Sequence, residues 1–328
     1  MPGRRIAHRC RGGRSIGSAP VSQHAIGIDV GGTKTKACLV RLADGAVITE
    51  RTAATPCQQG GRAVLELVGV LAEAMEAESS ARKLDTAGLG LCLPELVTGA
   101  GEPASAWNFD WRDLDYRQHL SRFGVVHIDS DVRAAAYAEG WIGAGVDADP
   151  FVYVTISTGL SHSLVIGGTP YAGARGFAIH FSGSDLVAFG GEDQDLQVRH
   201  NLELFASGKA LGERYGKLID RPGTTALQLF EAEAHDPRAA TMVGDALLSL
   251  ASYLGQLVNT LDPEILILGG GIGGDPSVNE RLASLTRPFI WADGARDLPI
   301  IRSVLGDTAC AVGVAALANK ARKQAVRI

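Results

Sequence analysis

A carboxylate followed by two glycines, at the end of an apolar strand, is the group of residues best placed to do chemistry. Asp29 lies near the end of the apolar run 25–30. The turn that follows consists of Gly31, Gly32, Thr33 and Lys34. Glycine lets a ligand approach the main chain closely, and the amides of such a turn can face an anion, with the threonine and lysine adding donors. The carboxylate is suited to hold Mg²⁺ through water. The segment indicates a phosphate and magnesium site, with a plain β-hairpin as the alternative.

Two further glycine turns follow apolar strands in the second half of the chain. The apolar run 151–156 leads to Thr158 and Gly159. The run 264–268 leads to three consecutive glycines, which are Gly269, Gly270 and Gly271. Turns of this design in both halves predict a nucleotide site, because two turns are then able to close on one phosphate chain. They match neither the P-loop pattern nor a clear dinucleotide fingerprint.

Asp131 is the candidate for the proton-accepting group. Phosphoryl transfer to an alcohol needs positioning, a metal ion and a carboxylate that accepts the hydroxyl proton. Asp131 follows the predicted strand 125–129 and begins a predicted helix, 131–140, whose macrodipole stabilises a negative charge there. Position alone favours a general base and a simple helix N-cap equally.

Five polar residues are candidates for binding a polyol, which needs side chains that both donate and accept hydrogen bonds. They are Glu95, Asn108, Ser130, His180 and Glu203. Each alone fits a surface polar group better than a ligand contact. His162 and His180 are also candidate metal ligands, but no cysteine or second histidine has a suitable spacing, so we expect no protein-bound transition metal.

Composition narrows the class of protein. The 328 residues suggest two domains, and the 46% hydrophobic and 20% charged content is globular. A net charge of −5 argues against nucleic acid as the main partner. No apolar stretch is long enough to span a membrane. The five cysteines are scattered without a CxxC pair, which is typical of a cytoplasmic protein.

Residues 1–22 are rich in arginine, glycine and serine. This composition predicts a disordered arm or a misplaced start codon. A basic tail that binds anions is the less favoured interpretation.

Strands and helices alternate along the chain, which predicts an α/β architecture. Apolar runs predict strands at 25–30, 36–41, 46–48, 86–93, 125–129, 151–156, 164–166 and 264–268. Helical spacing of apolar residues predicts helices at 61–82, 131–140, 202–216, 237–260 and 307–323.

These motifs resemble those of the ROK family of sugar kinases, a branch of the actin-like ATPase superfamily. The resemblance covers about residues 25–317. It rests on four segments, which are 28–34, 131–139, 152–159 and 261–271. It implies ATP and Mg²⁺ as cofactors, Asp131 as the general base and Glu203 as a sugar ligand. It also implies a homodimer.

The same resemblance implies a two-domain actin-like ATPase (ribonuclease H-like) fold. Mixed sheets flanked by helices would form both domains, and the active site would lie in the cleft between them. A small domain would comprise 23–130 plus 311–328, and a large domain would comprise 131–310.

Departures from the family pattern concern the acceptor pocket. Ser130 replaces the usual asparagine, His180 replaces a glutamate that binds sugar, and Glu95 replaces a glycine. Gly183 replaces a zinc-ligating histidine, and 194–201 lacks the zinc cysteines, so we expect no structural zinc.

A pocket built for one set of hydroxyl groups rejects others. We therefore expect a modified hexose, such as an amino sugar whose ammonium group pairs with Glu95, or a C7-cyclitol of antibiotic biosynthesis. Residues 161–163 are serine, histidine and serine, whereas glycines are common at these positions in the family. This difference in the second phosphate loop leaves open whether the protein uses ATP. An ordinary glucokinase and a non-catalytic sugar sensor are the alternatives.

Overall fold

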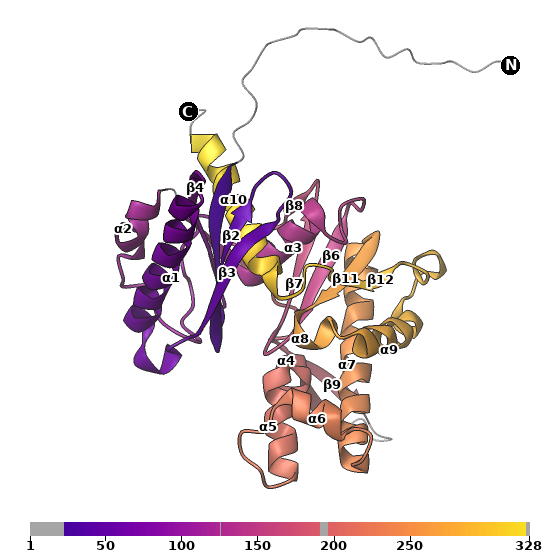
Figure 1. Cartoon of the computed structure of the whole chain (residues 1–328). Helices are drawn as coiled ribbons and strands as arrows, with labels where there is room; N and C mark the ends of the chain where they lie inside the picture. Colours follow the sequence, from indigo (N-terminus) through magenta and orange to yellow (C-terminus); the bar gives the residue numbers. More distant parts are fainter. Residues whose placement is uncertain (1–22, 125, 191–195, 326–328) are drawn as a thin grey trace, which may run out of the picture.

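Two five-stranded sheets of the same topology form the framework of the protein (Figure 1). The computed structural model describes residues 23–124, 126–190 and 196–325. The predicted arm at 1–22 lies outside them. The two-domain α/β class of fold expected from the sequence is confirmed.

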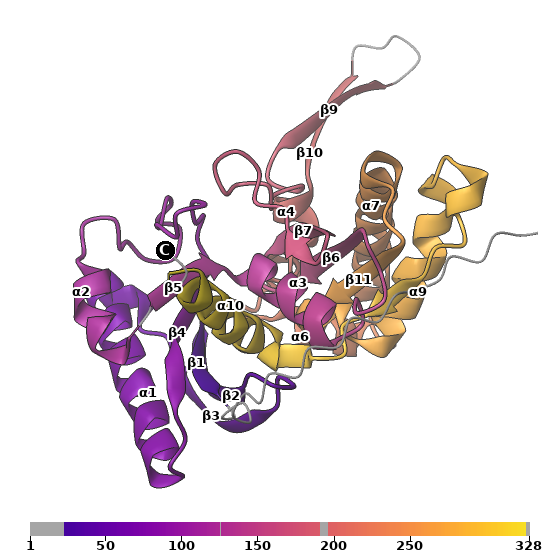
Figure 2. The ribbon, with the colours of Figure 1, turned by 90° about the horizontal axis from the view of Figure 1, so that it is seen from above.

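The first sheet has the strand order β3-β2-β1-β4-β5. Its strands are β1 (His24–Val30), β2 (Lys34–Arg41), β3 (Val47–Ala54), β4 (Thr86–Leu93) and β5 (Val126–Ser130). β1, β2 and β3 form an antiparallel meander, whereas β4 and β5 extend the sheet in parallel with β1. Helices α1 (Gly61–Ala81) and α2 (Tyr116–Leu120) lie on one side of this sheet, and α10 (Ala309–Ala325) lies on the other (Figures 1 and 2).

The second sheet repeats this order as β8-β7-β6-β11-β12. Its strands are β6 (Phe151–Ile156), β7 (Leu160–Ile166), β8 (Thr169–Pro170), β11 (Ile265–Gly269) and β12 (Ile300–Arg302). β6, β7 and β8 are again antiparallel, and β11 and β12 are again parallel to β6. Helix α3 (Asp131–Ile142) packs on one face, whereas α7 (Pro237–Leu261) and α9 (Pro276–Thr286) pack on the other.

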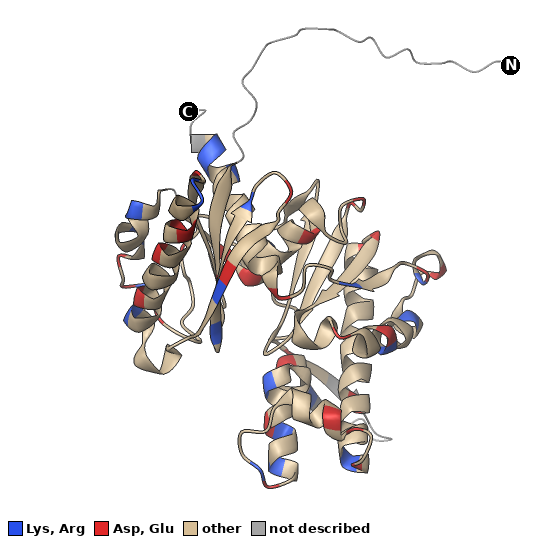
Figure 3. Cartoon of the chain, viewed as in Figure 1, with Lys and Arg blue, Asp and Glu red and all other residues tan. Residues whose placement is uncertain are grey.

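Shorter elements complete the second half of the chain. The helices are α4 (Leu202–Ala206), α5 (Gly208–Leu218), α6 (Ala226–Ala232) and α8 (Gly270–Gly273), and the hairpin strands are β9 (Asp185–Gly190) and β10 (Leu196–Asn201). Single 3₁₀ turns lie at Cys57–Gln59, Ser121–Phe123, Arg287–Phe289, Asp293–Ala295 and Gly306–Thr308. Helices such as α5 and α9 carry charges of both signs (Figure 3). None of the described helices is long and apolar enough to cross a bilayer.

The helical segment predicted over 202–216 is divided into two helices, because the chain breaks at Ser207. Ser207 is extended and its side chain accepts a hydrogen bond from the amide of Ala210, which starts α5 as a separate helix. The Gly208 amide donates to the carbonyl of Ser157 at 2.7 Å. At this break, the start of α5 is therefore hydrogen-bonded to the turn between β6 and β7.

Glycines let α10 pack between the first sheet and α3. A Cβ atom at Gly27 would lie 1.9 Å from the carbonyl oxygen of Ala311, and one at Gly90 would lie 2.1 Å from that of Val314. On the opposite side, a Cβ at Gly313 would lie 1.8 Å from the carbonyl of Ala134. The close approach brings the start of α10 to the ends of β1 and β4.

Candidate active site

The first glycine turn joins β1 to β2 beside Asp29. The Gly31 amide donates to the carbonyl of Lys34 at 3.0 Å, so the turn closes a β-hairpin. Gly32 and Thr33 at its tip are exposed. The hairpin that the sequence left as an alternative is thus the actual local structure, and its exposed tip is free to meet an anion.

The second and third glycine turns contact each other. Gly270 has a positive φ of 80°, and a Cβ there would lie 2.5 Å from the carbonyl oxygen of Ile156, next to the 157–159 turn. That turn is closed by a hydrogen bond from the Ser157 amide to the Gly159 carbonyl at 3.0 Å. Only glycine fits where the two turns meet, so the structure joins these predicted phosphate- and adenosine-side segments.

Asp131 is the first residue of α3 and is half-buried. The Val132 amide donates to its Oδ1 at 2.7 Å. Burial raises the pKa of Asp131 to about 6, against the lowering effect of this hydrogen bond. Such a carboxylate is ionised at neutral pH and is a stronger base than an ordinary aspartate, as proton abstraction requires.

Ser130 is the N-cap of α3. Its hydroxyl accepts a hydrogen bond from the Arg133 amide at 3.4 Å, and the residue is completely buried. This helix cap argues against the prediction that Ser130 binds substrate, because its side chain faces the helix. The N-cap alternative for Asp131 is wrong, since Ser130 fills that position.

Asp129 has a different environment from Asp131, although it is two residues away. The Arg133 Nε atom lies 2.5 Å from Asp129 Oδ1, and Arg133 also donates to the carbonyls of Val97 and Gly176. Although burial raises the pKa of Asp129, a hydrogen bond from His127 and the charge of Arg133 outweigh it and lower the pKa. Asp129 thus anchors two loops, which leaves Asp131 as the carboxylate available for chemistry.

Asp29 is half-buried and pairs with Cys92 in the parallel register of β1 and β4. Burial, followed by the charge of Asp131, raises the pKa of Asp29 to about 7. Among the described residues, the only hydrogen bond to its carboxylate is from the Cys92 thiol, at 3.7 Å. A carboxylate with so few donors fits the water-mediated magnesium site predicted for it, because a hydrated cation supplies the missing positive charge.

Glu95 is buried, with 3% of its surface exposed, and its carboxylate is saturated by hydrogen bonds. Its Oε2 accepts from the Ser105 hydroxyl at 2.5 Å and the Trp107 amide at 2.8 Å. Its Oε1 accepts from the Asn108 amide at 2.6 Å and the Asn108 side chain at 3.3 Å, with the Phe109 amide at 3.4 Å. These hydrogen bonds argue against the expected pairing of Glu95 with a substrate ammonium group, because they occupy the lone pairs of both carboxylate oxygens.

Asn108 reaches the first glycine turn. A Cβ atom at Gly32 would lie 2.7 Å from Asn108 Oδ1, and the Asn108 Nδ2 atom donates to the Pro94 carbonyl at 3.0 Å. The side chain is exposed. Glu95 therefore holds a loop that presents Asn108 beside the candidate phosphate site.

His180 and Glu203 lie on the second half of the chain. The exposed His180 ring meets the exposed Trp107 ring edge-on, with centroids 5.3 Å apart, and desolvation lowers the pKa of His180. Glu203 Oε2 accepts from the Leu160 amide at 3.0 Å and the Ser182 hydroxyl at 2.9 Å. A Cβ at Gly159 would lie 3.0 Å from the other oxygen, so Glu203 contacts the second phosphate turn.

Sequence reasoning missed Trp107, Asp307 and the two cysteines near Asp29. Asp307 precedes α10 and binds Lys36 at 2.7 Å and Lys34 at 3.5 Å, which fixes a charge beside the first turn. No local signal links it to β2, because 271 positions separate Asp307 from Lys36. Trp107 was detectable, since an aromatic next to a polar polyol candidate is typical of ligand sites.

The repeated sheet topology and the glycine turns at strand ends define an actin-like ATPase fold. The model of the ROK family matches residues 25–321, so the chain belongs to the ROK family.

Known proteins of similar sequence or structure include sugar kinases and a repressor. The chain is 27% identical to a glucokinase of Halalkalibacterium halodurans, over 82% of this chain and 88% of that protein. It is 28% identical to the xylose repressor of Bacillus subtilis, over 70% of this chain, and spans 60% of the repressor's length. The crystal structure of ROK hexokinase from Thermus thermophilus has a TM-score of 0.73 and 28% identity, with 92% of this chain and 99% of that chain covered.

Proposed function

We propose that this protein is an ATP- and Mg²⁺-dependent kinase that phosphorylates the primary hydroxyl of a hexose-like acceptor. The observation that carries the proposal is the half-buried Asp131 at the start of α3, with a pKa of about 6 and one oxygen without a described hydrogen bond. A non-catalytic binding protein does not need a strengthened base at this position. The glucokinase and hexokinase named above support the reaction class.

Each residue of the site has a proposed role in the reaction. Asp131 accepts the proton of the acceptor hydroxyl as the oxygen attacks. Asp29 positions the magnesium ion through water, and the ion neutralises charge on the phosphates. The turns at 31–34 and 157–159 hold the phosphates, and the glycines 269–271 lie on the adenosine side. Two lobes that meet around these residues would exclude water during transfer.

The residues proposed to bind the phosphoryl acceptor support a modified hexose as the substrate. Asn108, His180 and Glu203 are its proposed ligands, with Glu203 offering the oxygen that faces Gly159. Because hydrogen bonds saturate Glu95, that carboxylate is not left to select an ammonium group. An amino sugar or a C7-cyclitol of secondary metabolism remains our proposal, on the replacement of the family's glutamate by His180.

Several wider properties belong to the same proposal. We propose a cytoplasmic homodimer without structural zinc, acting on a small molecule rather than on nucleic acid or a membrane. The domain division at 130/131 and 310/311 is supported by the two sheets, each of which lies within one of the proposed domains. The active site is proposed to lie in the cleft between them.

The test is ADP release by the purified full chain with ATP and Mg²⁺. The acceptors are glucose, glucosamine, N-acetylmannosamine and a valiolone-type cyclitol. Faster turnover on a modified ring than on glucose supports the proposal. Glucose as the best acceptor would make the protein an ordinary glucokinase. No turnover on any acceptor, with a sugar still raising the melting temperature, would make it a sensor like its repressor relatives.

A further inference from the structure

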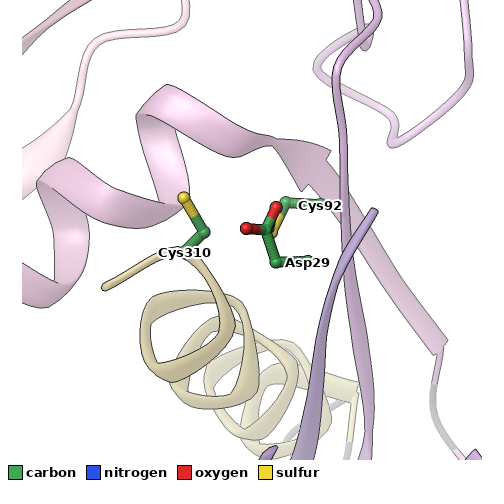
Figure 4. Close-up of side chains that lie close together, drawn as sticks. All are labelled: Asp29, Cys92 and Cys310. Carbon is green, nitrogen blue, oxygen red and sulfur yellow. Dashed lines mark hydrogen bonds between the residues drawn. The ribbon is translucent and has the colours of Figure 1, made fainter. Parts of the chain in front are cut away.

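Two thiols and a carboxylate come together where β1, β4 and α10 meet (Figure 4). Asp29 and Cys92 are register partners on adjacent parallel strands, and Cys310 is the second residue of α10. Their ligand atoms all lie within 4.8 Å of one another. Cys92 is completely buried, whereas Asp29 and Cys310 are half-buried.

The packing of the surrounding elements holds this group in place. The glycines at 27 and 90 let α10 lie directly on β1 and β4, which brings Cys310 against Cys92 and the buried Val314 and Ala134. No segment has to fold or move to assemble the three ligand atoms. A preformed arrangement of this kind lowers the cost of binding an ion.

The chemistry of the three donors fits a thiophilic divalent cation. Zinc bonds lie near 2.3 Å for sulfur and 2.0–2.2 Å for oxygen, and a tetrahedral ion with these bonds brings its ligands to about 3.5 Å from one another. The Cys92 Sγ to Asp29 Oδ1 distance is already 3.7 Å. Three protein ligands leave a fourth position for water. Magnesium, in contrast, prefers oxygen ligands and gains nothing from the thiols.

We propose that Asp29, Cys92 and Cys310 form a second metal site, which binds Zn²⁺ or Cd²⁺ and withdraws Asp29 from magnesium. Each thiol loses its proton to the solvent as its sulfur bonds the ion, with no change in oxidation state. The inhibitory consequence rests on the proposed kinase function, whereas binding itself does not.

Cadmium binding tests the site directly, through the ultraviolet charge-transfer absorption of cadmium thiolates. The full chain is used with Cys10→Ser and Cys57→Ser, which removes the cysteine outside the described residues and the half-buried Cys57. Titration with Cd²⁺ alone should saturate at one ion per chain. Adding Cys310→Ser should weaken the apparent affinity by about 100-fold or more, beyond the loss typical of a supporting residue. Adding Cys92→Ser should do the same.

The matched control is Cys38→Ser in the same background, because Cys38 is also completely buried but lies on β2 outside the group. It should bind Cd²⁺ as the background does. Equal binding by the background and the Cys310→Ser variant would overturn the site. So would an equal loss in the Cys38→Ser variant, because that would mark a general thiol effect.

The activity measurement separates this inference from the proposed function. Zn²⁺ should inhibit ADP release competitively with Mg²⁺, and Cys310→Ser should raise the inhibiting Zn²⁺ concentration by about 10-fold or more. If cadmium binds as described but no acceptor is phosphorylated, the kinase proposal fails and the metal site stands. If turnover is normal and Zn²⁺ inhibits both proteins equally, the competition at Asp29 is contradicted.

Discussion

The strand-end carboxylates and the carboxylate of the 94–109 loop differ in what the protein supplies to them. Asp29 and Asp131 are half-buried, and the hydrogen bonds described for them are a thiol contact and one backbone amide. Glu95 is more deeply buried, yet the Ser105 hydroxyl, three backbone amides and the Asn108 side chain surround it. Burial with few donors, and for Asp29 also the charge of Asp131, raises the pKa of Asp29 and Asp131 to about 7 and 6.

The number of hydrogen-bond donors around each carboxylate separates residues that take part in the reaction from residues that hold a loop in position. A carboxylate with unused lone pairs is ready to bind a cation or accept a proton, and it destabilises the empty protein. A saturated carboxylate has no such capacity, and it fixes the loop that surrounds it. The predictions below test this division.

Apart from the loss of the proposed base at Asp131, the largest effect is expected for Asp29→Asn. The neutral amide keeps the shape of the side chain but cannot offset the charge of the magnesium ion, so kcat should fall about 100-fold or more. ADP release at several Mg²⁺ concentrations measures this. Asp44→Asn, on an exposed turn, should behave as the wild type. A kcat for Asp29→Asn within threefold of the wild-type value would show that Asp29 does not take part in the reaction.

The pH dependence of kcat should show the raised pKa of Asp131. The base has to be ionised, so at saturating Mg²⁺, which keeps Asp29 ionised, kcat should fall about tenfold per pH unit below pH 6 and stay level above it. An ordinary aspartate would keep kcat level down to about pH 4. A level profile between pH 5 and 6, at saturating acceptor, would contradict the reactive state of Asp131.

Glu95→Ala should act on binding more than on chemistry. Removing the carboxylate leaves the donors of the 105–109 loop without a partner, at a cost of about 2–3 kcal/mol in the free energy of unfolding. Because the loop carries Asn108, the KM for the acceptor should rise about tenfold while kcat changes less.

A matched control exists in the same loop. Glu102 is exposed, so Glu102→Ala should leave both stability and KM unchanged. Glu95→Gln keeps the size of the side chain and part of its accepting capacity, and it should lie between the wild type and Glu95→Ala. A KM unchanged in Glu95→Ala would show that the loop does not bind the acceptor.

The smallest effect is a gain in stability. The folded pKa of Asp131 is raised above 3.8, so the folded state binds its proton more tightly, and stability is lost as pH rises through about 4 to 6. Asp131→Asn removes this penalty at pH 7.5 and should raise the melting temperature by roughly 2–4 °C. A lower melting temperature would mean that the carboxylate is satisfied in the folded protein.

The sequence predicted much of the fold, because the buried strands are short apolar runs bounded by turn residues. Helix 61–82 is observed at Gly61–Ala81, and strand 86–93 at Thr86–Leu93. The strand at 46–48 is longer, Val47–Ala54, since its polar second half pairs with β2 and gives no apolar signal. Helices α2 and α6 were missed, because each is short and buries few residues.

The candidate site was less predictable, because contacts between distant segments decide its state. Position suggested Asp29 and Asp131, as both follow apolar strands. The positions of Ser130 and Glu95 also suggested substrate binding. The Ser130 side chain instead caps α3, and donors from a loop ten to fourteen residues away saturate the Glu95 carboxylate. Cys310 meets Cys92 only through the glycines under α10, which no local pattern reveals.

The most direct test of the account compares turnover and acceptor binding for Asp131→Asn and the wild type. A general base contributes about 10²–10⁴-fold, so ADP release with the best acceptor should fall within or beyond that range. The rise in melting temperature on adding the acceptor should persist, because the variant keeps the size of the side chain. Wild-type turnover by Asp131→Asn would contradict the central claim that Asp131 accepts the proton.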